Sequence, residues 1–284
     1  MKAKVKGVDL GSGSVGRLVA RLALPAVAAQ VINLLYNLVD RMYVGGIEGV
    51  GMDALAGPGV VFPITLIVSV TESAIQIVFN NNLTYWSQGN SDYTAALTAM
   101  LSANQMVCLP LNGLGTGVQP LVSYNYGSGD TARIVKTVKI VTVVALCGST
   151  SVWLLSLFAP QVYGYIFSAT PAVMELICRY TPFFMMGTVM FFAQMTLQNV
   201  FVALNQAGLS IFLACLRKVI LLIPLCFILP HFFGAPGVFY SEGIADIVAG
   251  VITATTFFVM LPRILKKRRA YLELHAKADA APHI

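Results

Sequence analysis

Three acidic side chains stand next to or inside long uncharged stretches of the chain: Asp40, Glu72 and Asp246. A charge at the centre of a bilayer costs about 2.5 to 3.5 kcal/mol, so an acid kept there usually binds or relays a cation. Asp40 and Asp246 are therefore candidates for holding a coupling ion. Other interpretations stay open: Asp40 can pair with Arg41 at the membrane surface, and Glu72 can mark a helix break. Asp246 shares a helix face with Glu242, and both can instead lie near the surface beside a turn.

Amide side chains are frequent inside the same apolar stretches. A single amide at membrane depth usually joins two helices, whereas the whole set is typical of a polar cavity. The set comprises Asn33, Asn37, Asn80, Asn81, Asn82, Asn104, Asn112, Gln119, Gln194, Gln198 and Asn199. A second group combines methionine and phenylalanine: Phe183, Phe184, Met185, Met186, Met190, Phe191, Phe192 and Met195. Such residues are typical of a core, and they also suit an adaptable pocket for flat apolar ligands.

Sequence patterns of catalysis and metal binding are weak. None of the three histidines lies mid-span beside a serine or cysteine, so no nucleophile and base suggest themselves. The glycines of Gly113–Gly117 lack the strand and turn that a phosphate-binding loop requires, and they favour close helix packing instead. The five cysteines are odd in number and far apart, which favours neither a disulfide framework nor a metal site. We expect no enzyme activity, no catalytic residue and no cofactor.

The elements that position these side chains must suit a membrane. Only 11% of the residues are charged and 57% are hydrophobic, whereas a soluble domain carries about a quarter charged residues. Basic residues gather before the first apolar run (Lys2, Lys4, Lys6, Arg17 and Arg21) and after the last one (Arg263, Lys266, Lys267, Arg268 and Arg269). The net charge of +6 is therefore typical of membrane-flanking cations, and no nucleic-acid partner is expected.

The apolar runs predict an all-α, polytopic membrane protein with about seven transmembrane helices, because about 20 residues of helix cross a bilayer. The runs are Leu22–Val39, Ala54–Thr71, Ser73–Ser91, Tyr93–Gly129, Ile140–Ala159, Tyr180–Leu204, the stretch from the turn at Asn205–Gly208 to Phe232, and Val238–Leu261. Only Glu72 separates Ala54–Thr71 from Ser73–Ser91, so these two runs can form one long helix or two half-segments. Tyr93–Gly129 is too long for one untilted span, so we expect Pro110 and Pro120 to bend it. Prolines within the runs predict broken helices, which are typical of transporters: Pro25, Pro63, Pro110, Pro182 and Pro224. The polar start of the chain does not resemble a secretory signal peptide.

Several of these stretches resemble the MATE (multidrug and toxic compound extrusion) family. The opening of that family is matched by Leu22–Ala26, Tyr36–Gly45 and Ala54–Ile64. Its eighth helix is matched by Leu109–Leu114 and Gly117–Gly127, its tenth by Ala203–Ala207 and its twelfth by Ala245–Ile247. The resemblance implies two six-helix bundles around a central cavity, but the chain continues from the start of the second helix directly into what resembles the seventh. Helices three to six are therefore expected to be absent.

The resemblance also implies a division of the chain and a set of site residues. Residues 1–16 would be a polar cytoplasmic N-terminus, 17–70 a partial first bundle, 71–262 a six-helix second bundle and 263–284 a basic cytoplasmic tail. Asp40 and Asp246 would hold the coupling ion. The substrate cavity would be lined by Tyr36, Asn37, Asn80, Gln119, Met190, Gln194, Gln198 and Asn199.

The expected function is Na⁺- or H⁺-coupled export of organic cations and amphipathic compounds through a multi-pass protein of the plasma (inner) membrane. The alternative is a shortened membrane protein that does not transport, since several partners of Asp40 would be missing. Expected partners are the lipid bilayer, small amphipathic or cationic molecules, and a second copy of the chain if it is truncated.

The basic residues give a separate test of the helix count. Arg133–Lys139, Arg217–Lys218 and Arg263–Arg269 fall on one side if each span crosses once, and the positive-inside rule makes that side cytoplasmic. Seven spans would then leave the basic N-terminus outside, against the rule. The conflict disappears if Ala54–Ser91 crosses twice or forms a re-entrant hairpin, or if the chain is a deletion product.

Overall fold

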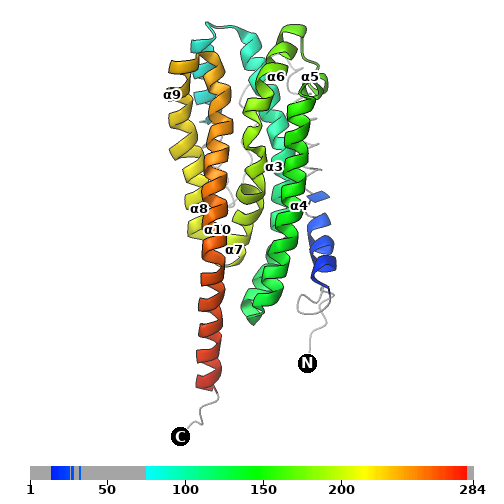
Figure 1. The fold of residues 1–284 in the computed structure, drawn as a ribbon, viewed down its shortest axis with the longest axis vertical. Coiled ribbons are helices and arrows are strands. Elements are labelled where there is room, and N and C mark those ends of the chain that lie inside the picture. Colours follow the sequence, from blue (N-terminus) through cyan, green and yellow to red (C-terminus); the bar gives the residue numbers. More distant parts are fainter. Residues whose placement is uncertain (1–13, 26, 29–31, 33–74, 280–284) are drawn as a thin grey trace, which may run out of the picture.

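The computed structural model describes residues 14–25, 27, 28, 32 and 75–279, and these form an upright bundle of helices (Figure 1). Helical residues 15–25 and 75–86 precede α3, and no strand occurs within the described ranges. The later elements are α3 (Ser91–Ser128), α4 (Thr131–Phe158), α5 (Gln161–Ile166), α6 (Pro171–Phe184), η2 (Met186–Met190), η3 (Phe192–Leu197), α7 (Gln198–Ala203), α8 (Ala207–Cys215), η4 (Leu216–Leu222), α9 (Ile223–Phe233) and α10 (Ala235–Asp279). The expectation of an all-α membrane protein is confirmed.

Among the described residues, four helices are long and apolar enough to cross a bilayer: α3, α4, the continuous stretch Ala207–Phe233 and Ala235–Leu274 of α10. A fifth span is possible if Pro171–Met190 and Phe192–Ala203, which meet at 40°, are counted together. The predicted spans Leu22–Val39 and Ala54–Thr71 lie largely or wholly outside the described residues, so the total of about seven stays a prediction. The division into a partial first bundle and a complete second one also stays a prediction.

The hairpin of α3 and α4 has clear local causes. Asn90 caps α3 by accepting a hydrogen bond from the Asp92 backbone, and Gly129 ends the helix with a φ of 81°, which glycine adopts without steric cost. Asp130 then caps α4 by accepting from the Arg133 backbone. The helix α3 runs unbroken for 38 residues through both internal prolines. The prediction of a broken helix at Pro110 is therefore wrong.

The helices break near two other prolines, as the sequence predicts. The 3₁₀ segment η2 begins shortly after Pro182 and passes into the π-helical segment η3. A second π-helical segment, η4, ends directly before Ile223 and Pro224. Proline removes a backbone donor and clashes with the preceding turn, so these departures from α-helical geometry have a local cause.

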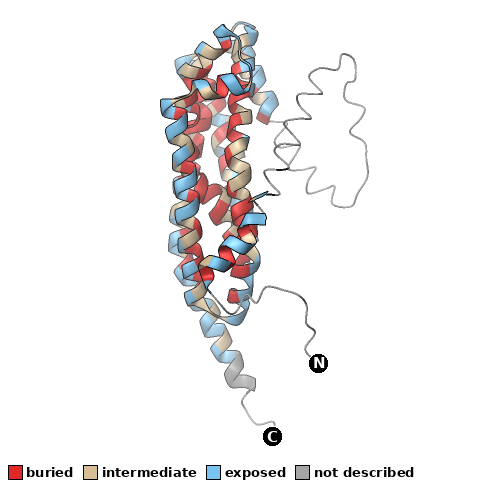
Figure 2. Cartoon of the chain, turned by 90° about the vertical axis from the view of Figure 1, so that its right-hand side faces the viewer, coloured by how far each residue is buried: buried red, intermediate tan, exposed pale blue. Residues whose placement is uncertain are grey.

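Buried residues face the interior of the bundle along its whole length (Figure 2). Six phenylalanines are almost fully enclosed: Phe79, Phe184, Phe191, Phe201, Phe239 and Phe257. The methionine and phenylalanine group is thus mainly core, because Phe184, Met185, Phe191 and Phe192 are buried while Met190 and Met195 are half-buried. Outside the spans, the short α5 is fastened to α4 by a 2.9 Å hydrogen bond between Tyr163 and Ser156, and burial raises the pKa of the Tyr163 phenol.

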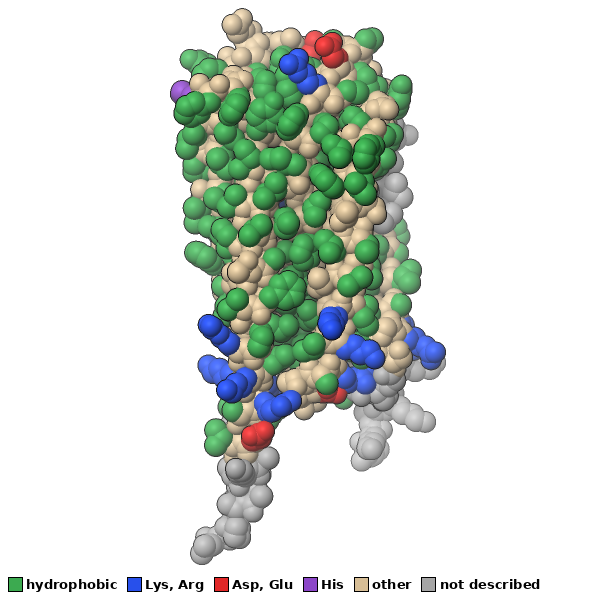
Figure 3. All heavy atoms as spheres, in the orientation of Figure 1, with side chains coloured by type: hydrophobic (Ala, Val, Ile, Leu, Met, Phe, Trp, Pro, Cys, Tyr) green, Lys and Arg blue, Asp and Glu red, His purple; other side chains and the backbone are tan. Residues whose placement is uncertain are grey.

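The outer surface is apolar around its middle, and basic side chains gather at the end from which α10 extends (Figure 3). The start of α4 and the late part of α10 meet there, because Arg269 donates to the Thr131 hydroxyl at 2.8 Å. Arg268 donates to the Tyr126 carbonyl at the end of α3. The positive-inside rule predicts that this end of the bundle faces the cytoplasm, and the orientation stays a prediction.

Candidate functional site

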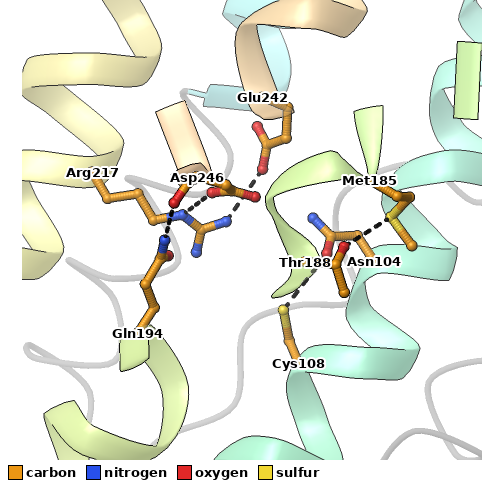
Figure 4. A network of polar contacts seen from close by, with 8 residues as sticks. All are labelled: Asn104, Cys108, Met185, Thr188, Gln194, Arg217, Glu242 and Asp246. Atoms are coloured by element: carbon orange, nitrogen blue, oxygen red, sulfur yellow. Dashed lines mark hydrogen bonds and ion pairs between the residues drawn. The ribbon is translucent and has the colours of Figure 1, made fainter. Parts of the chain in front are cut away.

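An ion cluster lies inside the bundle, where η4 faces α10 (Figure 4). Arg217 Nε lies 2.5 Å from Asp246 Oδ1, and Arg217 Nη2 lies 3.3 Å from Glu242 Oε1. All three residues are enclosed, with 8% of Arg217, 5% of Glu242 and 2% of Asp246 exposed. One guanidinium therefore bridges two carboxylates in the protein interior.

Local structure explains how the three groups meet. Glu242 and Asp246 are one turn apart on α10, so their carboxylates point from the same helix face. Arg217 is the second residue of the π-helical η4, and its guanidinium lies 5.3 Å from the centre of the Phe191 ring. A planar fork of donors suits two acceptors at once. Burial of these charges is tolerable because the guanidinium compensates the carboxylates and a second cation, Lys218, lines the same cavity as Glu242.

Gln194 connects the ion cluster to η3. Its Nε2 donates to the backbone oxygen of Asp246 at 2.7 Å. Its Oε1 is buried and has no hydrogen-bond partner within the described part of the chain. A long sulfur hydrogen bond lies nearby, where Cys108 donates to Asn104 Oδ1 at 3.8 Å (Figure 4). The cluster thus sits among polar groups from α3, η3, η4 and α10.

A chain of amides joins α3 to α7. Gln119 Nε2 donates to Asn199 Oδ1 at 3.0 Å, and Asn199 Nδ2 donates to Asn112 Oδ1 at 2.7 Å. The same Asn199 nitrogen lies 2.6 Å from the Met195 carbonyl. A Cβ atom on Gly115 would overlap Asn199, so glycine is needed for this close approach. The amides here join helices, which was the first of the two interpretations that the sequence left open.

Two cavities of about 240 Å³ each adjoin the ion cluster. The first, here called the amide cavity, is lined by polar residues that include Asn112, Gln194, Gln198, Asn199 and Ser210. The second, here called the acid cavity, is lined by Glu242, Asn104 and Cys108 together with the apolar Ile75, Phe79 and Leu101. Met195, Arg217 and Lys218 line both. Arg217 therefore stands on the boundary between the two.

The structure brings some predicted residues together and separates others. Asp246 and Gln194 are in direct contact, Gln119 and Asn199 are hydrogen-bonded, and Gln198 lines the amide cavity. Met190 is half-buried, and a Cβ on Gly250 of α10 would collide with it. Asn80 is exposed and lines neither cavity. Tyr36, Asn37 and Asp40 lie outside the described residues.

Sequence reasoning was wrong about Arg217. It grouped this residue with the basic flanks of the membrane, whereas the structure places it inside the bundle against two acids. Asn104 and Asn112 line the cavities and belong to the amide set that the sequence singled out, although they were not among the residues expected to line the substrate cavity. The available signal was that Arg217 interrupts one apolar run while Glu242 and Asp246 interrupt the next, since buried charges in membranes usually pair.

No set of three or more histidine, cysteine or acidic side chains that could hold a metal ion occurs among the residues that the structure describes. The chemistry available at the site is electrostatic: two carboxylates can hold a monovalent cation, and amides can orient polar groups of a ligand.

The chain is similar to solved transporter structures. An outward-facing multidrug resistance MATE family transporter of the MOP superfamily aligns with a TM-score of 0.61 and 17% identity, over 76% of this chain and 50% of that one. MATE in the bent conformation aligns with a TM-score of 0.64 and 14% identity, over 70% and 44%. A MOP superfamily transporter from Pyrococcus furiosus, described as having a binding pocket of reverse polarity, gives 0.62 and 16%, over 70% and 44%.

The chain thus spans about half the length of the transporters that it matches. No curated protein sequence gives a significant match. The sequence model of the MatE family matches residues 66–228, which is more than half of the chain and includes the amide chain and Arg217. This multi-pass membrane protein therefore belongs to the MatE family.

Proposed function

We propose that the protein takes part in exporting amphipathic and cationic compounds across the plasma (inner) membrane, in exchange for Na⁺ or H⁺. Membership of the MatE family supports transport as the general activity. The observation that carries the proposal is the pair of acids, Glu242 and Asp246, buried in a membrane-length helix beside two cavities. Such acids are costly in a membrane and commonly mark ion and substrate paths.

In this mechanism the coupling ion and the substrate compete for the same acids. Binding of one cation releases the other, and the bound cation shifts the populations of the inward-open and outward-open states. The irregular segments η2, η3 and η4 supply points at which the helices can bend as the bundle rocks. Asp40, with Tyr36 and Asn37, is proposed as a second coupling acid in the part of the chain outside the described residues.

The chain aligns with about half of each solved transporter, which leaves open what forms the other side of a central cavity. The part of the chain that aligns covers only 44–50% of these solved transporters. We propose that a second copy of the chain supplies the other side of the cavity. This arrangement would place two ion clusters on opposite sides of one path.

The test is ion-driven efflux of a fluorescent organic cation from vesicles that contain the purified full chain. Asp246→Asn keeps the shape of the side chain and removes its charge, so it is expected to abolish efflux, as is Asp40→Asn. Glu175→Gln is the matched control, because Glu175 is exposed on α6 and its loss should leave efflux unchanged.

Unchanged efflux in both Asp246→Asn and Asp40→Asn would contradict the assignment of these acids. An unmutated chain that gives no response to a Na⁺ or H⁺ gradient would contradict the proposed transport and support the alternative of a membrane protein that does not transport.

A further inference from the structure

The acid pair of the proposed transport site already holds a cation, the side chain of Arg217. We infer that Arg217 is an internal counter-ion that occupies the binding site for an amphipathic monovalent organic cation, which binds to Glu242 and Asp246 in exchange for it. This inference rests on the proposed function only in taking the two acids as cation-binding groups.

The contacts of Arg217 define what a replacing ligand must provide. Its guanidinium reaches Asp246 at 2.5 Å and Glu242 at 3.3 Å, and it lies against the Phe191 ring at 5.3 Å from the ring centre. A ligand with a flat, delocalised cation carrying N–H groups can make the same three contacts. The longer contact to Glu242 is the weaker one, so this acid is the point at which an incoming cation competes first.

The walls of the acid cavity suit an amphipathic ligand. Glu242 forms its charged wall, and Ile75, Phe79, Leu101 and Leu222 form its apolar wall. A volume of about 240 Å³ suits one aromatic ring with a small cationic group. Because Glu242 lines this cavity directly, the cationic group would meet its carboxylate while the ring lies on the apolar wall.

Charge balance sets the stoichiometry. Two basic residues, Arg217 and Lys218, line the cavities beside two acids, so the four groups sum to zero when all are ionised. Removing Arg217 from the acids without a replacement would leave uncompensated buried charge, which is strongly unfavourable. The arrival of one monovalent cation at the acids must therefore accompany the release of Arg217, whose own charge then lies among the polar side chains of the amide cavity.

The backbone around the cluster offers a way for Arg217 to move. Arg217 lies in the π-helical segment η4, and Gln194, which holds the Asp246 backbone, lies in the π-helical segment η3. A π-helical turn contains an extra residue, and its conversion to an α-helical turn changes a side chain's direction by about 100°. Such a rotation would carry Arg217 away from the acids along the cavities that it already lines.

The experiment measures binding without any gradient, so its outcome does not depend on transport. Binding of phenylguanidine to the full chain in detergent is compared with binding of phenylurea, which is similar in shape and uncharged. The unmutated chain is expected to prefer phenylguanidine. Arg217→Gln is expected to bind it at least tenfold more tightly, because the internal competitor is gone. Adding Asp246→Asn to Arg217→Gln should remove that gain.

Lys266→Gln is the control, since it removes one positive charge from an exposed position on α10 and should leave binding unchanged. Should Arg217→Gln not fold, Arg217→Lys keeps the charge but loses the two-point fork, and it should still bind phenylguanidine more tightly than the unmutated chain. Equal affinity of the unmutated chain for the two compounds, or no gain in the folded Arg217 variant, would overturn the inference.

Discussion

Arg217 and Asp246 are 29 residues apart in the chain, and their side chains meet at 2.5 Å inside the bundle. The contact joins a π-helical segment to the longest helix of the described structure, α10. Any movement of η4 against α10 must therefore break or carry this ion pair. The folding of the bundle and the proposed cation exchange depend on the same contact.

Loss of Asp246 should destabilise the fold more than loss of Glu242. Asp246→Asn breaks the shorter contact to Arg217, and removal of one partner from a buried ion pair costs about 3 to 5 kcal/mol. Glu242→Gln breaks the 3.3 Å contact and leaves the shorter one, so its cost should be smaller. Thermal unfolding of the purified variants in detergent would measure the order, with Glu175→Gln as an exposed control. A larger loss for Glu242→Gln would contradict this ranking.

Replacement of the whole cluster should restore stability without restoring function. The combination Arg217→Met, Glu242→Met and Asp246→Leu removes all three charges and fills their volume with apolar atoms. Exchanges of this kind are often neutral or stabilising by about 1 to 4 kcal/mol. We expect a melting temperature close to that of the unmutated chain, together with loss of cation binding and efflux. Retained efflux in this variant would show that the cluster has no part in transport.

Gly187 should tolerate no side chain. A Cβ atom there would overlap the Asp246 side chain and approach the Gly243 carbonyl on α10. Gly187→Ala should therefore push η2 from α10 and destabilise the bundle by about 1 to 3 kcal/mol. Gly208→Ala is the matched control, because a Cβ atom there meets nothing within 4 Å and alanine favours the helix α8. Similar melting temperatures for the two variants would argue against the close packing of η2 on α10.

Asn199 should matter more for stability than Asn80, although both are amides in apolar runs. Asn199→Leu removes the link between Gln119 and Asn112, and hydrogen bonds between membrane helices contribute about 0.6 kcal/mol each. A loss of about 1 to 2 kcal/mol is expected. Asn80→Leu changes an exposed position and should cost little or nothing. Chemical unfolding of both variants in mild detergent would compare them, and equal losses would count against the amide chain as a structural link.

Assembly of two copies can be tested by measuring the molecular mass of the protein. If a second copy completes the cavity, the protein extracted in mild detergent should have the mass of two 30.5 kDa chains by light scattering after correction for detergent. When the protein is reconstituted at decreasing ratios of protein to lipid, efflux should then fall by a larger factor than the amount of protein does. A single-chain mass with full efflux activity would contradict the two-copy proposal.

The sequence by itself determined the class of structure. Apolar runs, scarce charge and basic ends predict a membrane bundle, because the bilayer requires every backbone polar group to be bonded within a helix or barrel. Prolines at 182 and 224 also predicted where the helices depart from α geometry. Asp246 was recognised as a buried acid worth attention because its charge is costly in an apolar run.

The tertiary structure decided which groups meet. Periodicity placed Glu242 and Asp246 on one face, and the charge of Arg217 in the preceding apolar run indicated a need for a partner, but only the packing shows that the two meet. The same applies to the amides: Asn199 lies in a hydrogen-bonded chain while Asn80 is exposed, although their sequence surroundings look alike. A residue's type sets the cost of burying it. Only the packing of helices far apart in sequence decides whether a partner is there to offset that cost.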